Sequence, residues 1–303
     1  MTKYSSNVKV MRKLKEKIKW GDRWDGTRVK SLDGMQALMP YLFTNRCDSE
    51  VYTLESIDVT ELLEELKNIQ AANPHLKITL FHCFITALAK TIHNRPYLNR
   101  FISGRRFYQR RRLTFAFVIK TFFGDDAKEV VKILDVGQDM SLLEISDNIS
   151  QSAKDIRAKG KGGADSLLGL FAIAPRFFCR MLIGVFRFLD YHGWMPKSIC
   201  IEDPNYTSVL ISNLGSIQCN ACYHHLNNYG NNSLMVTIGT VRQERLIKDG
   251  KEELRSICDF GITLDERIAD GFYFAQSVKI LRHIISNPGL LLDPVKEKID
   301  YEQ

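Results

Sequence analysis

Hydrophobic and polar residues follow two periods along this chain. Alternating positions and short apolar runs predict strands, whereas apolar residues three and four positions apart predict helices. The predicted strands are 50–58, two strands within 101–120 joined by a Ser103-Gly104 turn, 207–213, 233–238 and 256–264. The predicted helices begin near residue 58 and cover 79–93, 141–159 and 272–285. This alternation predicts one α/β domain whose sheet is covered by helices on one face.

One segment, residues 166–189, is apolar nearly throughout and follows a glycine-rich linker at 159–163. Pro175 interrupts it, so it does not form one continuous membrane span. On a helix that begins at Pro175, the side chains of Arg176, Arg180 and Arg187 fall on one narrow stripe, opposite a wide apolar face. This pattern fits a helix packed against the body of the protein, a helix lying in a membrane interface, or the wall of an acyl-chain pocket.

The composition is that of a folded protein. Of 303 residues, 45% are hydrophobic and 25% are charged, which excludes disordered, collagen-like and coiled-coil chains. The formal net charge of +7 favours an anionic partner: a nucleic acid, an anionic membrane surface or a phosphorylated carrier. Seven scattered cysteines and an N-terminus without an apolar leader predict a cytoplasmic protein with reduced thiols. We divide the chain into a basic arm (1–30) and one domain (31–303) with a hydrophobic insertion at about 164–205.

The strongest chemical signal is the run Thr263-Leu-Asp-Glu-Arg-Ile-Ala-Asp-Gly-Phe272, where a predicted strand ends and a helix begins. Such junctions usually carry the reactive groups of α/β proteins. The same charged residues also fit a buried ion-pair network made by Asp265, Arg267 and Asp270. The sequence leaves both interpretations open.

This run resembles the Asp-His-Arg-x-x-Asp-Gly signature of the acyltransferase core of 2-oxoacid dehydrogenase complexes, and the related signature of chloramphenicol acetyltransferases. Four further segments resemble that family in the same order: 57–62, 95–101, 141–145 and the Ser-Asn-Leu-Gly strand end within 211–217. The resemblance implies a chloramphenicol acetyltransferase-like two-layer sandwich of a mixed sheet with helices. It also implies a homotrimer with active sites in channels between subunits, and an acyl thioester of coenzyme A or of an acyl-carrier protein as co-substrate.

One departure concerns the catalytic base. In the family the motif histidine removes a proton from the acceptor, which then attacks a thioester carbonyl; here Glu266 occupies that position. A carboxylate, with an ordinary pKa of about 4.3, is a weaker base than imidazole unless burial raises its pKa. Either Glu266 itself or one of His224 and His225 is therefore expected to act as the base. Ser212 is the candidate for stabilising the oxyanion.

The resemblance also assigns a structural part to Asp270, which in the family braces the interior through a charged partner. Arg23 and Arg28 are the candidates for that partner. No lipoyl domain precedes the core, so we expect a stand-alone acyltransferase.

Two other clusters are given no functional part. Cys219, Cys222, His224 and His225 lie too close together in sequence for an ordinary structural zinc site, and no metal is expected. A group of arginines on adjacent predicted strands fits a solvated face or a phosphate-attracting site better than a nucleic-acid surface. These arginines are Arg105, Arg106, Arg110, Arg111 and Arg112.

The sequence therefore predicts an acyltransferase with an unidentified acceptor. The alternative is a trimeric scaffold or ligand-binding pseudoenzyme that lost its base. Peripheral membrane or lipid contact through 175–189 is compatible with both.

Overall fold

The computed structural model describes residues 18–120, 129–159, 173–248 and 250–301. Its centre is a six-stranded mixed sheet in the order β2-β9-β8-β7-β5-β6. β7 runs parallel to β5 and β8, and the other neighbouring strands pair antiparallel. The strands are β2 (Glu50–Asp58), β5 (Thr114–Lys120), β6 (Glu129–Asp135), β7 (Val209–Asn213), β8 (Leu234–Lys248) and β9 (Lys251–Asp265).

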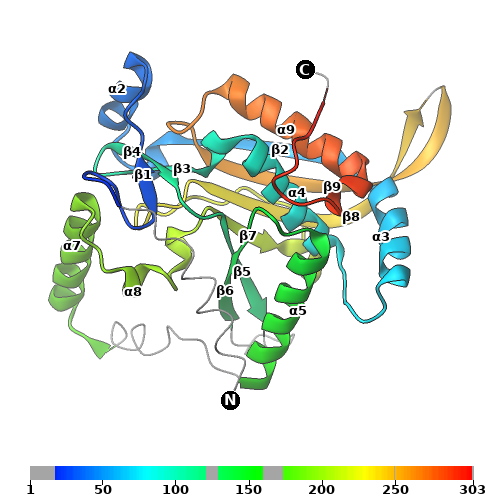
Figure 1. Cartoon of the computed structure of the whole chain (residues 1–303), viewed down its shortest axis with the longest axis horizontal. Helices are drawn as coiled ribbons and strands as arrows, with labels where there is room; N and C mark the ends of the chain where they lie inside the picture. Colours follow the sequence, from blue (N-terminus) through cyan, green and yellow to red (C-terminus); the bar gives the residue numbers. More distant parts are fainter. Residues whose placement is uncertain (1–17, 121–128, 160–172, 249, 302–303) are drawn as a thin grey trace.

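Four long helices cover one face of this sheet (Figure 1). They are α3 (Thr60–Ala72), α4 (Leu80–Asn94), α5 (Leu142–Lys159) and α9 (Gly271–Ser286). The core between the layers includes Phe84 of α4, whose ring meets Phe260 of β9 edge-on at 4.7 Å between centroids. Burial of these apolar faces is the main force that holds helices and sheet together. The predicted two-layer α/β architecture is confirmed.

A second, three-stranded sheet corrects the prediction for residues 101–120. β3 (Arg100–Ser103) and β4 (Arg106–Arg110) form the hairpin at the Ser103-Gly104 turn, and β1 (Gly26–Arg28) pairs with β4. The apolar run 113–119 instead forms β5 in the large sheet. The prediction merged two strands because β4 and β5 are separated by only three residues, all arginine or leucine.

The five arginines of this region do not form one solvated face. Arg110 is buried and donates to the carbonyl of Tyr206 and to Asn231. Arg111 pairs with Asp22 at 2.8 Å, and Arg112 pairs with Asp135 at 2.7 Å. Only Arg105 and Arg106 of this group are exposed, because their hairpin turn projects from the small sheet.

Three further helices, α2, α7 and α8, lie at one side of the molecule (Figure 1). α2 (Gly34–Leu42) begins at Asp33, whose carboxylate accepts the N–H of Gln36. α7 (Arg176–His192) follows Pro175, ends at the left-handed Gly193 and contains no buried residue. Short helices complete the chain: α8 (Lys197–Cys200), η1 (Arg46–Ser49), η2 (Pro96–Asn99), η3 (Pro204–Tyr206), η4 (Leu214–Ile217) and η5 (Pro288–Leu291).

Within the described residues, no helix combines the length and the apolar character needed to cross a bilayer. Most of the basic arm (1–17), the glycines of the predicted linker and the first part of the predicted insertion lie outside the described residues.

Candidate functional site

The acidic motif borders a cavity of about 420 Å³ at the end of β9. α2, β2, β9 and the beginning of α9 form its walls. Glu266 is half-buried, and its backbone N–H donates to the carbonyl of Ser49 at 2.9 Å. Apolar side chains dominate the remaining wall: Met35, Met39, Val51, Leu264, Ala269 and Phe274. The cavity thus places the carboxylate residues Glu266, Asp270 and Asp33 beside an apolar surface.

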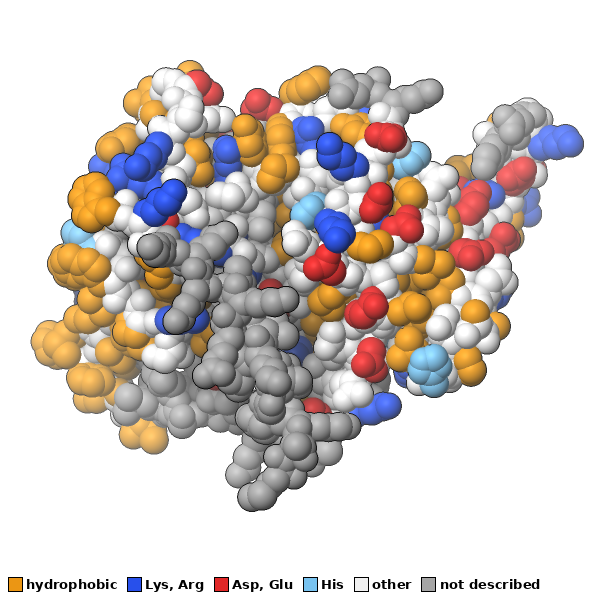
Figure 2. Space-filling model, in the orientation of Figure 1, with side chains coloured by type: hydrophobic (Ala, Val, Ile, Leu, Met, Phe, Trp, Pro, Cys, Tyr) orange, Lys and Arg blue, Asp and Glu red, His pale blue; other side chains and the backbone are white. Residues whose placement is uncertain are grey.

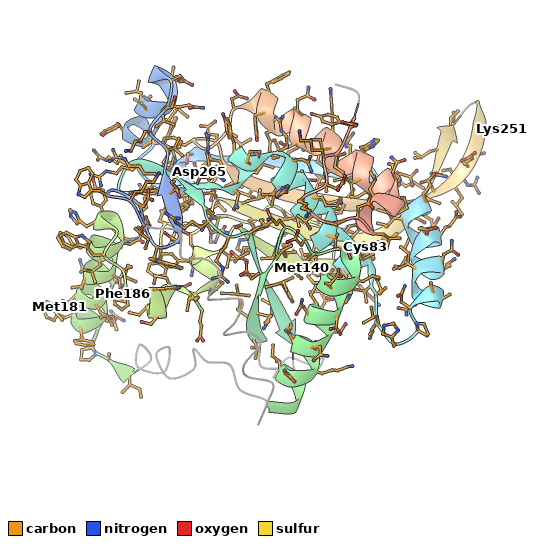
Figure 3. The ribbon with its side chains drawn as sticks, in the orientation of Figure 1. Cys83, Met140, Met181, Phe186, Lys251 and Asp265 are labelled. Atoms are coloured by element: carbon orange, nitrogen blue, oxygen red, sulfur yellow. The ribbon has the colours of Figure 1, made fainter. Side chains whose placement is uncertain are left out.

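A buried charge network fixes the backbone on both sides of Glu266. Asp265 is fully buried and receives a bidentate bond from Arg267, with both N–O distances 2.7 Å. The Ser49 hydroxyl donates to the same carboxylate at 3.0 Å, and Arg46 Nε lies 4.0 Å from it. The ion-pair interpretation is confirmed for Asp265 and Arg267. These two side chains therefore hold the backbone of the motif in place; Asp265 is labelled in Figure 3. Glu266, between them in sequence, lines the cavity.

Arg46 was missed from the sequence. It is buried and donates to the backbone carbonyls of Asn227 and Gly230. Burial lowers the pKa of its guanidinium, and the Asp265 carboxylate opposes that effect. Because its partners are carbonyl groups far along the chain, no sequence pattern indicates this role.

Asp270 is exposed and caps α9, where its carboxylate accepts the N–H of Tyr273 at 2.7 Å. The expectation that it pairs with Arg23 is wrong within this chain. Arg23 instead pairs with Asp25 at 2.9 Å and with Asp190 at 3.0 Å. Within the described part of the chain, no ion pair joins Asp270 to Arg28 either. Asp270 therefore stabilises the helix N-terminus that borders the cavity.

Ser212 lies elsewhere, on the sheet face that the long helices leave uncovered. Its neighbours Val209 and Ile211 enter the core, so strand alternation directs Ser212 to the other face, next to Thr237 of β8. Its side chain is half-buried, and its hydroxyl makes no hydrogen bond to the residues that the structure describes. An unengaged hydroxyl on a strand can donate to an oxyanion.

The loop 218–230 crosses this uncovered face; we call it the crossing loop. The Thr237 hydroxyl bonds to both the N–H and the carbonyl of Cys222, which fixes the loop to β8. Farther across the sheet, the rings of Tyr223 and Tyr52 lie 5.6 Å apart between centroids. The loop therefore runs from the β7 end, past Ser212's neighbour Thr237, to β2.

Both candidate histidines lie on the crossing loop and are exposed. Nδ1 of His224 lies 2.9 Å from the carbonyl of His225, and Nδ1 of His225 lies 3.2 Å from the carbonyl of Leu226. Because a carbonyl only accepts, Nδ1 must carry the proton in each case. A neutral imidazole in this state presents a basic Nε2 to its surroundings.

Within one chain, the candidate site residues therefore lie in two separate groups. Glu266 and Asp270 border the cavity, whereas Ser212, His224 and His225 occupy the uncovered sheet face and the crossing loop. Neither histidine nor Ser212 lines the cavity. No group of three or more His, Cys, Asp or Glu residues with metal-binding geometry occurs among the described residues.

Sequence reasoning also missed the part of the wall that α2 supplies. Met35, Gln36 and Met39 line the cavity, at the spacing of one helical face. That spacing could have indicated the helix in the sequence. The helix has only nine residues and contains Pro40, however, so its pattern is too short to stand out.

Solved structures with the same arrangement define the class of protein. Chloramphenicol acetyltransferase superimposes with a TM-score of 0.52 and 11% identity, over 86% of this chain and 99% of that one. A probable dihydrolipoamide acetyltransferase from Listeria monocytogenes gives 0.56 and 14%, over 86% and 95%. The dihydrolipoamide acetyltransferase of Azotobacter vinelandii gives 0.58 and 19%, over 87% and 94%. The fold is that of the chloramphenicol acetyltransferase-like proteins.

The family follows from the sequence comparison. The model of the 2-oxoacid dehydrogenases acyltransferase (catalytic domain) family matches residues 42–173 and 196–292, and the chain belongs to this family. A search of curated proteins finds no match. The unmatched interval, 174–195, contains the whole of α7. This helix is therefore an addition to the segments that the family shares.

Proposed function

We propose that this protein is an acyltransferase that moves an acyl group from a thioester of coenzyme A or an acyl-carrier protein to an unidentified acceptor. The observation that supports this best is the cavity beside Glu266, in a chain of an acyltransferase family. The acyltransferase domain comprises residues 31–303, with the insertion at 164–205 and the basic arm before it. Its net charge of +7 suits a phosphate-bearing donor. Seven free cysteines, three of them buried, suit a reducing, cytoplasmic setting.

We propose further that three copies assemble and that each active site lies between two of them. Within one chain, the cavity group and the crossing-loop group are separate. Contact between copies would bring the cavity of one protomer to the uncovered sheet face of the next. This arrangement would explain why Ser212, His224 and His225 lie on a face that none of the described helices covers.

The Azotobacter enzyme offers a comparison for the residues. Its study concerns the roles of a serine, a histidine and, four positions later, an asparagine in the catalytic mechanism. Glu266 and Asp270 have the same spacing of four. Ser212 would correspond to the serine.

The proposed reaction begins when a base removes the proton of the acceptor's thiol, hydroxyl or amine. The acceptor's electron pair attacks the thioester carbonyl carbon, and the Ser212 hydroxyl donates to the resulting oxyanion. The C–S bond then breaks, and the leaving thiolate takes the proton back from the base. Either Glu266 or the free Nε2 of His224 or His225 can act as the base. Asp270 acts through α9, whose N-terminus it caps at the border of the cavity.

The second candidate function is a trimeric scaffold or ligand-binding pseudoenzyme. The observation that favours it is Glu266 itself, since an ionised carboxylate repels the negative charge that develops on a thioester oxyanion. This protein would bind a thioester or a lipid without turning it over.

The test is release of free thiol from acetyl coenzyme A and longer acyl thioesters by the purified protein. We expect Glu266→Gln or His225→Ala to lower the rate about a hundredfold, the usual scale for loss of a general base. His75→Ala, which alters an exposed histidine far from both groups in sequence, is the matched control. Unchanged rates in both variants would contradict the assigned roles. Thioester binding without thiol release would establish the pseudoenzyme instead.

A further inference from the structure

α7 exposes an apolar face that nothing in the described structure covers. Its inward side chains, including Phe186 and Leu189, pack on the cluster around Met195, Cys200 and Tyr206. Its outward side chains are apolar as well: Phe177 is 79% exposed, Phe188 55%, and Trp194, just after the helix, 63%. Met181 and Val185 complete this outward face. An amphipathic helix that only packs on its own domain would place polar residues there.

The exposed apolar surface continues from α7 to α2. Arg105, at the tip of the β3–β4 hairpin, lies 5.1 Å from the ring centroid of Tyr41 on α2. The adjacent Gly104 packs so closely on the carbonyl of Tyr191 that a Cβ there would overlap it. The hairpin therefore bridges the two helices. α2 adds exposed apolar side chains that do not line the cavity: Leu38, Tyr41 and Leu42.

We call this surface the apolar edge, formed by α2, the β3–β4 turn and α7. Figure 2 shows hydrophobic side chains gathered along it, next to a group of Lys and Arg side chains. In Figure 3, Met181 lies on the outer side of α7 and Phe186 toward the body. Exposed apolar patches of this extent usually mark an interaction site.

The exposed charges that α7 and the β3–β4 turn add to the apolar edge are positive. Its exposed arginines form no ion pair with a described residue; they are Arg105, Arg106, Arg176, Arg180 and Arg187. The acidic residue nearest to them on α7, Asp190, is already held by Arg23 at 3.0 Å. The edge therefore presents aromatic and aliphatic side chains together with uncompensated positive charge.

We propose that the apolar edge binds the surface of a membrane that contains anionic lipids. Phe and Trp side chains enter the headgroup boundary, and arginines beside them pair with lipid phosphates. A second copy of the chain is a poorer occupant, since two such edges would bring ten arginines together. α7 lies outside the segments that match the family, so this part of the surface is not one of the family's shared segments. The proposal does not depend on catalytic activity.

Co-sedimentation with lipid vesicles tests the proposal. The full chain is mixed with vesicles of phosphatidylcholine alone and of phosphatidylcholine and phosphatidylglycerol in equal amounts. We expect binding to the mixed vesicles only, weakened by salt. Arg180→Gln with Arg187→Gln should lower the partition coefficient about thirtyfold. Phe177→Ser with Phe188→Ser should lower it at least as much, because both groups then lose their burial in the interface.

The matched control is Ile247→Ser with Leu254→Ser, which removes apolar side chains that are 82% and 63% exposed on the β8–β9 hairpin. Lys251 marks the tip of this hairpin, on the opposite side of the molecule from Met181 (Figure 3). The control should bind like the unaltered protein, and all variants should keep the same thermal unfolding midpoint. Equal binding to both kinds of vesicle, or an unchanged partition coefficient in the Phe177 and Phe188 variant, would overturn the proposal. A smaller oligomer in that variant, without loss of vesicle binding, would assign the edge to a second copy.

Discussion

Asp265 carries a negative charge that is wholly removed from solvent beside the cavity. Its charge is balanced by Arg267 and approached by Arg46, and its remaining acceptor capacity is used by Ser49. A buried ion pair adds little net stability, but removal of one partner leaves the other charge unpaired. Loss of the Asp265 carboxylate would therefore leave the buried guanidinium groups of Arg267 and Arg46 without this negative partner.

We predict that Asp265→Asn lowers the free energy of unfolding by about 3–5 kcal/mol. Asp139→Asn is the control, because its pair with Lys296 is exposed and should contribute little to stability. Urea unfolding of both variants measures the difference. Equal losses would show that the buried network does not hold the motif in place.

His82 on α4 is the residue that couples stability to pH most clearly. It is buried, its Nδ1 has no hydrogen-bond partner among the described residues, and burial together with the charge of Lys77 lowers its pKa to about 4. The unfolded chain binds this proton at about pH 6.5. Between these values the unfolded state takes up more protons, so stability is lost as the pH falls from about 6.5 toward 4.

We expect this group alone to cost about 2 kcal/mol between pH 7 and pH 5. Denaturant unfolding at the two pH values measures this drop in the free energy of unfolding. In His82→Phe the drop between pH 7 and pH 5 should be smaller by about 2 kcal/mol. His75→Asn, at an exposed histidine, should leave the pH dependence as it is. A His82→Phe protein with the full original pH dependence would contradict the assignment.

At the scale of elements, the crossing loop depends on a glycine of β9. A Cβ at Gly261 would overlap the carbonyl oxygen of Cys222 and approach the Thr237 hydroxyl at 2.6 Å. The loop can therefore lie flat on the sheet only because this position has no side chain. The close approach of Cys222 to Gly261, together with the hydrogen bonds from Thr237, therefore positions the loop that carries His224 and His225.

We predict that Gly261→Ala lowers the free energy of unfolding by about 1–3 kcal/mol, the usual cost of overpacking, and displaces the crossing loop. Gly184→Ala, in α7 with open space around it, should instead raise stability by about 0.5–1 kcal/mol. Thermal unfolding compares the two, and hydrogen exchange of residues 218–230 reports on the loop. An unaltered loop in Gly261→Ala would mean that the sheet does not fix it.

The long apolar elements could be predicted from the sequence because each carries its own period. β2 spans the predicted residues 50–58, and α4 and α9 begin and end within a residue or two of their predicted limits. α2 escaped prediction because it is short and contains Pro40. The outer parts of β8 and β9 were not predicted, because they form a projecting hairpin in which charged residues pair across the strands. Such strands have no continuous apolar face to reveal them in the sequence.

For the candidate site, the motif located Glu266 and Asp270, but only the fold shows that they lie apart from Ser212. The distance between the two groups depends on how the crossing loop passes over the sheet. That path is set by Thr237, Gly261 and Arg46, which contact the loop across long stretches of sequence. A local pattern carries no information about such contacts.

At the scale of the whole molecule, we propose a thioester-dependent acyltransferase whose sites form between copies. One chain holds the cavity and the uncovered face with the crossing loop in separate places. In the proposed assembly, the cavity of one copy meets the crossing loop of the next. The oligomeric state and the bound ligand are therefore the properties that bear most directly on the account.

Native mass spectrometry of the purified protein, before and after addition of acetyl coenzyme A, measures both at once. We predict the mass of three copies, with coenzyme A or an acyl thioester retained or taken up. Glu266→Gln should keep the trimer, because this side chain lines the cavity without joining the buried network. A monomer that binds no added thioester would contradict the account.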